Sequence, residues 1–316
     1  MSPHISRQNP THPSARSTTR VVRHLGILLV SLTLAGLLGG CGGPKEDPIL
    51  RLSSDEALDL GKSYMTDEKW VKARRHLIHA FEVEPNSRQG REALLLAADA
   101  YYQQGGIDNY IKCEAKYRDF LNRFPTSERA DYAQFKVADC LASRTERPDR
   151  DQSVTEAGLA AFEELLRLYP TSEHVPQARQ RIRELTDQLA AHELVIGTFY
   201  TRFGKRGICQ GAVSRLEHLR DTYPQFSRMD EGLYQLAVAY SMCRRPVEAL
   251  ESLATLRRRY PDSERLEDAL DLESEIAESL PDDATGVAEA VTGAEAATES
   301  NEAGTDEAET TGSEER

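Results

Sequence analysis

The fold is decided by the stretch LGKSYMTDEKWVKARRHLIHAFEVEP, which spans residues 60–85. Large apolar and small residues recur in it at helical intervals, and a proline closes it. Small residues let two antiparallel helices approach, large residues fill the space between them, and the proline ends the second helix. The positions that match a helix-pair repeat of about 34 residues are Leu60, Gly61, Tyr64, Ala73, Leu77, Ala80 and Pro85.

The same pattern returns near the end of the chain. A last unit closes at Pro261, and each of its substitutions keeps a small residue small and a large apolar residue large. This spacing is that of the tetratricopeptide repeat, so we expect an all-α solenoid. The matching positions of the last unit are Leu233, Leu236, Ala237, Tyr240, Ala249, Leu253 and Leu256.

Second helices also end at Pro125, Pro170 and Pro224, which predicts about five helix pairs. We expect the first helices of the middle units at residues 91–103, 130–143 and 177–203. A further helix at 264–280 suits a C-terminal cap with a polar outer face, with Leu266, Leu270 and Ile276 turned inward.

The N-terminus has the order of a lipoprotein signal peptide. Arg20, Arg23 and His24 precede an apolar run that leads through small residues to Cys41. This resembles a lipobox, which implies removal of residues 1–40 and lipidation of Cys41. Gly42, in place of an Asp, favours the outer membrane, on its periplasmic side. The alternative is an uncleaved N-terminal anchor helix.

Composition divides the remaining chain into three parts. We expect a lipidated cysteine and tether at 41–54, the solenoid at 55–280, and a disordered acidic tail at 281–316. The tail holds eleven Asp or Glu, one Arg and no aromatic residue. Loss of the signal peptide removes four arginines and lowers the formal charge from −13 to −17, which argues against nucleic acid as a partner.

Four cysteines follow Cys41 in a compartment that permits disulfides. Cys113 begins one second helix and Cys140 ends the next first helix, and Cys209 and Cys243 occupy the equivalent places between units four and five. Antiparallel stacking brings such positions together, so we predict disulfides Cys113–Cys140 and Cys209–Cys243. The alternative is four small buried thiols.

The sequence offers little for catalysis. His76 and His79 lie one helical turn apart, but no third metal ligand accompanies them. His192-Glu193 lacks the second histidine of a metalloprotease helix, and neither a phosphate-binding glycine loop nor a Gly-x-Ser-x-Gly elbow occurs. We therefore expect no enzyme, no metal site and no cofactor, and interpret the protein as a binding scaffold.

The central sequence resembles a known family over residues 54–262. The segments that carry the resemblance are DYA (131–133), PDRDQ (148–152), AFEELLRLYPTS (161–172), LAAHEL (189–194), FY (199–200), AVSR (212–215) and YP (223–224). They resemble the BamD family, lipoproteins of the outer-membrane β-barrel assembly machine. The chain departs from the family in extra residues at 205–210, in its extra cysteines and in its acidic tail.

The resemblance implies a lipid-anchored periplasmic scaffold that binds two kinds of partner. Its C-terminal units hold the POTRA domain of the barrel-inserting subunit, and Arg215 is the candidate contact residue. Its N-terminal units receive unfolded outer-membrane protein precursors in a concave groove, for which the candidate first-helix residues are Leu58, Lys62, Met65, Leu95, Asp99 and Tyr102. Another envelope scaffold, a secretin pilotin or a cell-division coordinator, and a lipid-anchored cell-wall hydrolase are the alternatives.

Overall fold

The structure, a computed structural model, describes residues 47–202 and 209–280. The predicted signal peptide, Cys41, most of the tether and the acidic tail lie outside these residues. The described part is all-helical. Its helices are η2 (Pro48–Arg51), α2 (Ser54–Thr66), α3 (Trp70–Val83), α4 (Arg88–Gln104), α5 (Ile107–Arg123), α6 (Ala130–Ala142), α7 (Ser153–Leu168), α8 (Val175–Arg202), α9 (Cys209–Thr222), α10 (Met229–Met242), α11 (Pro246–Arg259) and α12 (Leu266–Ser279).

The short helix η2 belongs to a different unit from the helices α2 to α12. In η2 the Asp47 carboxylate accepts a hydrogen bond from the backbone N–H of Ile49 at 3.2 Å, which starts the helical turn.

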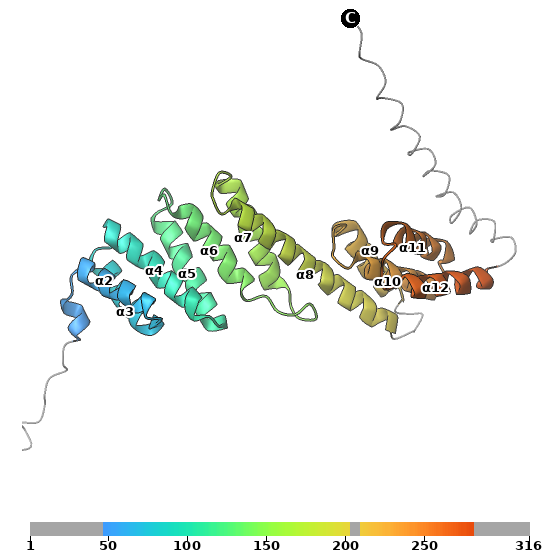
Figure 1. The fold of residues 1–316 in the computed structure, drawn as a ribbon, viewed down its shortest axis with the longest axis horizontal. Coiled ribbons are helices and arrows are strands. Elements are labelled where there is room, and N and C mark those ends of the chain that lie inside the picture. The colour runs from blue at the N-terminus through green and yellow to red at the C-terminus, as the bar shows by residue number, and fades with distance from the viewer. Residues whose placement is uncertain (1–46, 203–208, 281–316) are drawn as a thin grey trace, which may run out of the picture. The chain divides into compact units, whose positions relative to one another are not determined.

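From α2 onward each helix packs on the next, in the order expected of tetratricopeptide hairpins (Figure 1). The pairs are α2–α3, α4–α5, α6–α7, α8–α9 and α10–α11, and α12 packs on α11 as the cap. The predicted fold class is confirmed. No helix within the described ranges is long and apolar enough to cross a membrane.

The repeat residues act as the sequence predicts. Ala73, Leu77 and Ala80 are fully buried, and a Cβ at Gly61 would come within 2.6 Å of the Leu77 side chain. The small residue therefore sets how closely α2 and α3 approach. Leu60 differs, because 39% of it remains exposed.

Helices α2 and α4 begin directly after capping serines. The Ser53 hydroxyl accepts from the N–H of Glu56 at 3.3 Å, and the Glu56 carboxylate accepts from the N–H of Ser53 at 2.9 Å, which forms a capping box on α2. Helix α4 begins at Arg88, three residues before the predicted start, because the Ser87 hydroxyl accepts from the N–H of Gly90 at 2.9 Å. The predicted end of the long first helix, Phe203, lies outside the described residues.

Serines in the turns after second helices bind the preceding first helices. The Ser172 hydroxyl donates to Asp131 at 2.7 Å, and the Ser263 hydroxyl donates to Asp230 at 2.5 Å. Asp131 and Asp230 lie in the first turns of α6 and α10. These bonds join the two ends of a repeat that are far apart in sequence.

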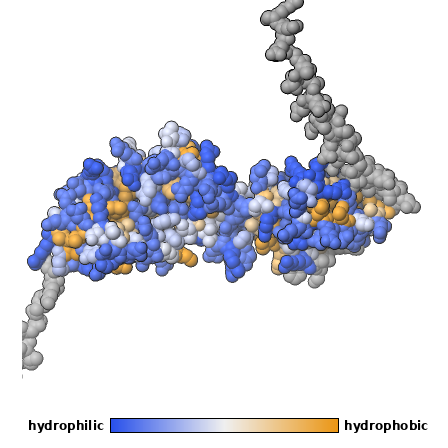
Figure 2. Space-filling view, in the orientation of Figure 1, coloured by the Kyte–Doolittle hydropathy of each residue, from blue (hydrophilic) through white to orange (hydrophobic). Residues whose placement is uncertain are grey.

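Two apolar clusters form the core. One gathers side chains from α4 to α8, and the other gathers side chains from α8 to α12. Helix α8 contributes to both, through Ala178 and Leu185 to the first and through Ala190 and Leu194 to the second. On the face shown in Figure 2, hydrophobic residues form separate patches in a mainly hydrophilic surface.

The inward face of the C-terminal cap, helix α12, differs from the prediction. In α12 the inward residues are Ala269 and Ile276, with Leu266 and Leu272 partly buried beside them. Leu270, expected to face inward, is 46% exposed. It lies one residue beyond Ala269, about 100° around the helix from it, and therefore outside the buried stripe.

The structure contains two disulfides. Cys113 of α5 is bonded to Cys140 of α6 with a Cα–Cα distance of 6.5 Å, and Cys209 is bonded to Cys243 with a Cα–Cα distance of 5.5 Å. Each bond joins the second helix of one repeat to the first helix of the next, so the bonds tie neighbouring repeats together. That the cysteines are oxidised in the cell stays a prediction.

Candidate functional site

A cavity of about 780 Å³ lies between α4, the end of α5 and the turn at residues 124–129. We call it the arginine groove. Four guanidinium groups line it, from Arg88, Arg91, Arg123 and Arg129. Its apolar lining comes from Leu95, Leu96, Phe120, Phe124 and Pro125, and its carboxylates are Glu92, Asp99 and Glu128.

Aromatic rings support three of these arginines. The guanidinium of Arg91 lies 5.7 Å from the centre of the Phe124 ring, that of Arg123 lies 5.4 Å from Phe81, and that of Arg129 lies 4.7 Å from Tyr132. Such contacts hold a cation in place without neutralising it. The groove therefore combines positioned positive charge with apolar surface.

Asp99 is covered by two tyrosines. The Tyr132 hydroxyl donates to its carboxylate at 2.5 Å, and the Tyr117 hydroxyl donates to the same oxygen. Burial, together with the negative charge of Asp99, raises the pKa of Tyr117 and of Tyr132 well above the usual value, so both hydroxyls stay protonated as donors. Of the other two carboxylates, Glu92 is paired with Lys62 at 2.8 Å.

Only some of the six predicted groove residues lie at the arginine groove. Leu95 and Asp99 border the arginine groove, although Leu95 is only 6% exposed and mainly packs in the core. Lys62 reaches the groove through its ion pair with Glu92. Met65 is partly exposed but does not line the cavity. Leu58 is only 4% exposed, so its predicted place on a binding surface is wrong: the side chain is committed to packing.

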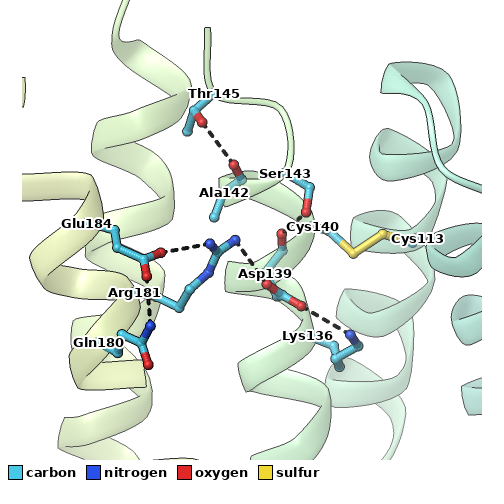
Figure 3. Close-up of polar contacts among 10 residues, drawn as sticks. All are labelled: Cys113, Lys136, Asp139, Cys140, Ala142, Ser143, Thr145, Gln180, Arg181 and Glu184. Carbon is cyan, nitrogen blue, oxygen red and sulfur yellow. Dashed lines mark hydrogen bonds and ion pairs between the residues drawn. A yellow bond between two sulfur atoms is a disulfide. The ribbon is translucent and has the colours of Figure 1, made fainter. Parts of the chain in front are cut away.

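Tyr102 takes part in an internal network and does not line the groove. The Lys136 ammonium lies 3.4 Å from the centre of its ring, and burial followed by the nearby charge of Asp139 raises the pKa of Tyr102 to about 12. Asp139, 6% exposed, accepts from Lys136 at 3.1 Å and from Arg181 at 3.3 Å (Figure 3). Arg181 also binds Glu184 at 2.9 Å. The network connects α4, α6 and α8, which assigns Tyr102 to the scaffold.

A second cavity, of about 330 Å³, contains the predicted contact residue Arg215. We call it the Arg215 pocket. The Arg215 guanidinium donates to both carboxylate oxygens of Glu193, at 3.1 and 3.2 Å. Only 10% of the Glu193 side chain is exposed, whereas 48% of Arg215 is exposed. A buried carboxylate therefore holds an arginine whose other face is open to solvent.

Neighbouring residues complete the Arg215 pocket. Asp151, Glu156 and Tyr223 line it, and His192 donates from Nδ1 to the Pro148 carbonyl oxygen at 2.6 Å. Hydrogen bonds from Ser153 lower the pKa of Asp151, so this carboxylate stays ionised. Sequence reasoning missed the role of Glu193, which lies in the LAAHEL segment but contacts Arg215 only after α8 and α9 pair.

The absence of a metal site is a prediction for the whole chain. Within residues 47–202 and 209–280, no group of three or more His, Cys, Asp or Glu could hold a metal ion. His76 packs on Tyr64 with ring centres 5.0 Å apart and contacts the Lys72 carbonyl oxygen, while His79 is buried. Both histidines therefore take part in packing within the α2–α3 pair.

Residues 52–245 match the family described as "Outer membrane lipoprotein" (YfiO), and residues 231–263 match the tetratricopeptide repeat. Among curated relatives, "Outer membrane protein assembly factor BamD" of Caulobacter vibrioides is 26% identical over 239 residues, which cover 74% of this chain and 76% of that protein. The protein of the same name from Rickettsia prowazekii is 26% identical over 242 residues, 75% of this chain and 92% of that one. The Haemophilus influenzae protein is 25% identical over 67% and 82%, respectively.

Solved structures that the chain matches include the TPR2AB domain of yeast Sti1 in its pHSP90 complex and the MamA protein. The first is 13% identical, with a TM-score of 0.39 over 79% of this chain and 96% of that one. The second is 16% identical, with a TM-score of 0.29 over 71% and 94%.

Proposed function

Since the chain belongs to the YfiO family of outer membrane lipoproteins, we propose that it is an assembly factor for outer membrane proteins and acts as a scaffold rather than as an enzyme. The observation that carries this proposal is the extent of the family match. Residues 52–245 include both the arginine groove and the Arg215 pocket. The curated relatives are named as assembly factors, a role that needs no catalytic group.

The arginine groove is the proposed site for incoming precursors. An unfolded outer membrane protein presents extended segments in which apolar side chains alternate with polar ones. The partly exposed apolar residues of the groove, Leu96 and Phe124, suit the former, and its arginines suit carboxylates. The contact can be weak, because a membrane-anchored scaffold and a neighbouring insertion machine form one assembly with millimolar effective concentrations.

The Arg215 pocket is the proposed site for the POTRA domain of the barrel-inserting subunit. Glu193 holds Arg215 on one side and leaves about half of its side chain exposed. An arginine fixed in this way presents its remaining N–H groups to a carboxylate of the partner with little loss of side-chain entropy. Glu193 therefore positions Arg215, and Arg215 makes the contact.

The proposed location is the periplasmic side of the outer membrane, with lipid on Cys41. Several acyl chains make such an attachment effectively permanent, so the helices need not contact the membrane. Two disulfides between repeats suit the oxidising periplasm.

Purification of the tagged protein from solubilised membranes tests this function. The proposal predicts an associated barrel protein with POTRA domains, and predicts that Arg215→Glu lowers its recovery at least tenfold. Arg167→Glu is the matched control, because Arg167 is also an exposed helical arginine paired with a glutamate, at 2.9 Å from Glu164, and lies outside the pocket. Recovery of a secretin or of cell-division proteins without a POTRA protein would overturn the proposal in favour of another envelope scaffold.

A further inference from the structure

The proposed function leaves the acidic tail unused. Residues 281–316 carry eleven carboxylates and one arginine, with no aromatic residue. Six of the carboxylates fall within the last fifteen residues, 302–316. A segment of this composition gains little from apolar burial, so its binding sites must be sought among positive charges.

The arginine groove offers such charges. Two of its three carboxylates have partners, because Glu92 is paired with Lys62 and Asp99 accepts from two tyrosines. Among its arginines, Arg123 binds Asp119 at 2.7 Å, whereas Arg91 and Arg129 contact aromatic rings, and Arg88 is exposed at the start of α4. The groove thus has an excess of positive charge around an apolar surface.

Two other cavities suit an acidic segment less well. The Arg215 pocket has one arginine against Asp151, Glu156 and Glu193. A cavity of about 190 Å³ between α9, α10 and α11 has two arginines against Glu248 and Glu251. Carboxylates at least balance the arginines in both, so neither attracts the tail as the arginine groove does.

We propose that the acidic tail of the same chain, residues 281–316, binds in the arginine groove and competes there with incoming segments. The part of this proposal that concerns incoming segments rests on the proposed function, and the binding of the tail does not. The tail follows α12, and the seven helix-to-helix steps from α5 to α12 amount to about 70 Å at 8–10 Å each. Residues 281–301 span about 70 Å when extended, which leaves 302–316 and their six carboxylates for the groove.

The composition of the tail determines which ligands it can keep out of the arginine groove. Without aromatic residues it leaves the apolar lining at Leu96 and Phe124 unfilled, so its contact is electrostatic and salt-sensitive. Covalent attachment makes this contact intramolecular, so its occupancy does not depend on the protein concentration. The tail would thus keep out weak polar ligands, whereas a segment that also buries apolar side chains would displace it.

Hydrogen exchange of the complete mature chain tests the proposal, because it needs no precursor and stays informative if the proposed function fails. The full chain is compared with a chain that stops after residue 280, and with one of full length in which every tail Asp or Glu is changed to Asn or Gln. We expect amides of residues 86–99 and 121–130 to exchange about twofold to tenfold faster in both variants. This range corresponds to a groove that the tail occupies between about one half and nine tenths of the time in the full chain. Salt at 1 M should give the full chain the same fast exchange.

Charge reversal in the groove provides the matched comparison. Arg88→Glu with Arg91→Glu should abolish the difference between full and shortened chains. Arg179→Glu with Arg183→Glu, two exposed arginines of α8 outside the groove, should preserve it. Equal exchange in the full, shortened and neutralised chains would overturn the proposal, and so would protection that rises with protein concentration, since that result would assign the contact to a second copy.

Discussion

Replacement of Gly197 by Ala tests how closely α8 and α9 must approach to form the Arg215 pocket. A Cβ at position 197 would come 2.5 Å from Cγ and 2.6 Å from Cδ2 of Leu216. Leu216 is 1% exposed, so its side chain has no free space into which to turn. The helices must therefore separate or Leu216 must leave its rotamer, which costs about 1–3 kcal/mol.

A gain in helix propensity opposes this cost. Glycine is about 1 kcal/mol less favourable than alanine inside a helix, so the expected net loss in the free energy of unfolding is about 0–2 kcal/mol. Arg215 precedes Leu216, and Glu193 lies one helical turn before Gly197. A shift of α9 should therefore also weaken the Arg215–Glu193 pair and lower recovery of the partner.

Urea unfolding followed by circular dichroism measures the loss, and Gly211→Ala is the control. A Cβ at Gly211 would meet its nearest atom, in the Tyr200 ring, at 3.8 Å, which is ordinary contact. We expect Gly211→Ala to be neutral or to stabilise the protein by up to about 1 kcal/mol. Equal stability of the two variants would refute the close approach of α8 and α9.

Three further predictions concern the scaffold. Asp139→Ala leaves Lys136, whose side chain is 13% exposed, without its carboxylate, and should lower the free energy of unfolding in urea by about 2–4 kcal/mol. Asp149→Ala, the control in an exposed ion pair, should change it by less than about 1 kcal/mol. Equal losses in the two variants would contradict the role of the network. Mass spectrometry of native protein with and without reductant should show two disulfides, and changing either cysteine pair to serine should cost about 3 kcal/mol, while four free thiols would contradict this prediction. The pKa of Tyr102 is raised to about 12 in the fold, so its contribution to stability is complete below pH 10 and is lost as the pH rises toward 12. Tyr102→Phe should therefore reduce the fall in the free energy of unfolding between pH 10 and pH 12. An unchanged fall would count against the network.

The sequence predicted those features of the fold that depend on local pattern. Helix pairs follow from the spacing of residues such as Ala73, Leu77 and Ala80, all of which the structure buries. Helix ends were predicted to within a few residues, and the early start of α4 follows from the capping hydroxyl of Ser87.

Features that depend on contacts between distant residues were harder to predict. Leu58 was expected on a binding surface and is buried, whereas Leu270 was expected to face inward and is exposed. Each residue step turns a helix by about 100°, so an error of one position moves a side chain between the buried stripe and the surface. The roles of Asp99 and Glu193 depend on Tyr132 and Arg215, which lie 33 and 22 residues away in the chain. No periodicity within one helix encodes such partners.

Site-specific photocrosslinking in growing cells tests the central claim most directly. A photoreactive amino acid at Leu96, which is partly exposed in the arginine groove, reports what the groove contacts during synthesis of envelope proteins. The account predicts crosslinks to newly made outer membrane proteins in a short pulse, and their loss during a chase as those proteins enter the membrane. A pulse without such crosslinks, or crosslinks that persist unchanged through the chase, would contradict it.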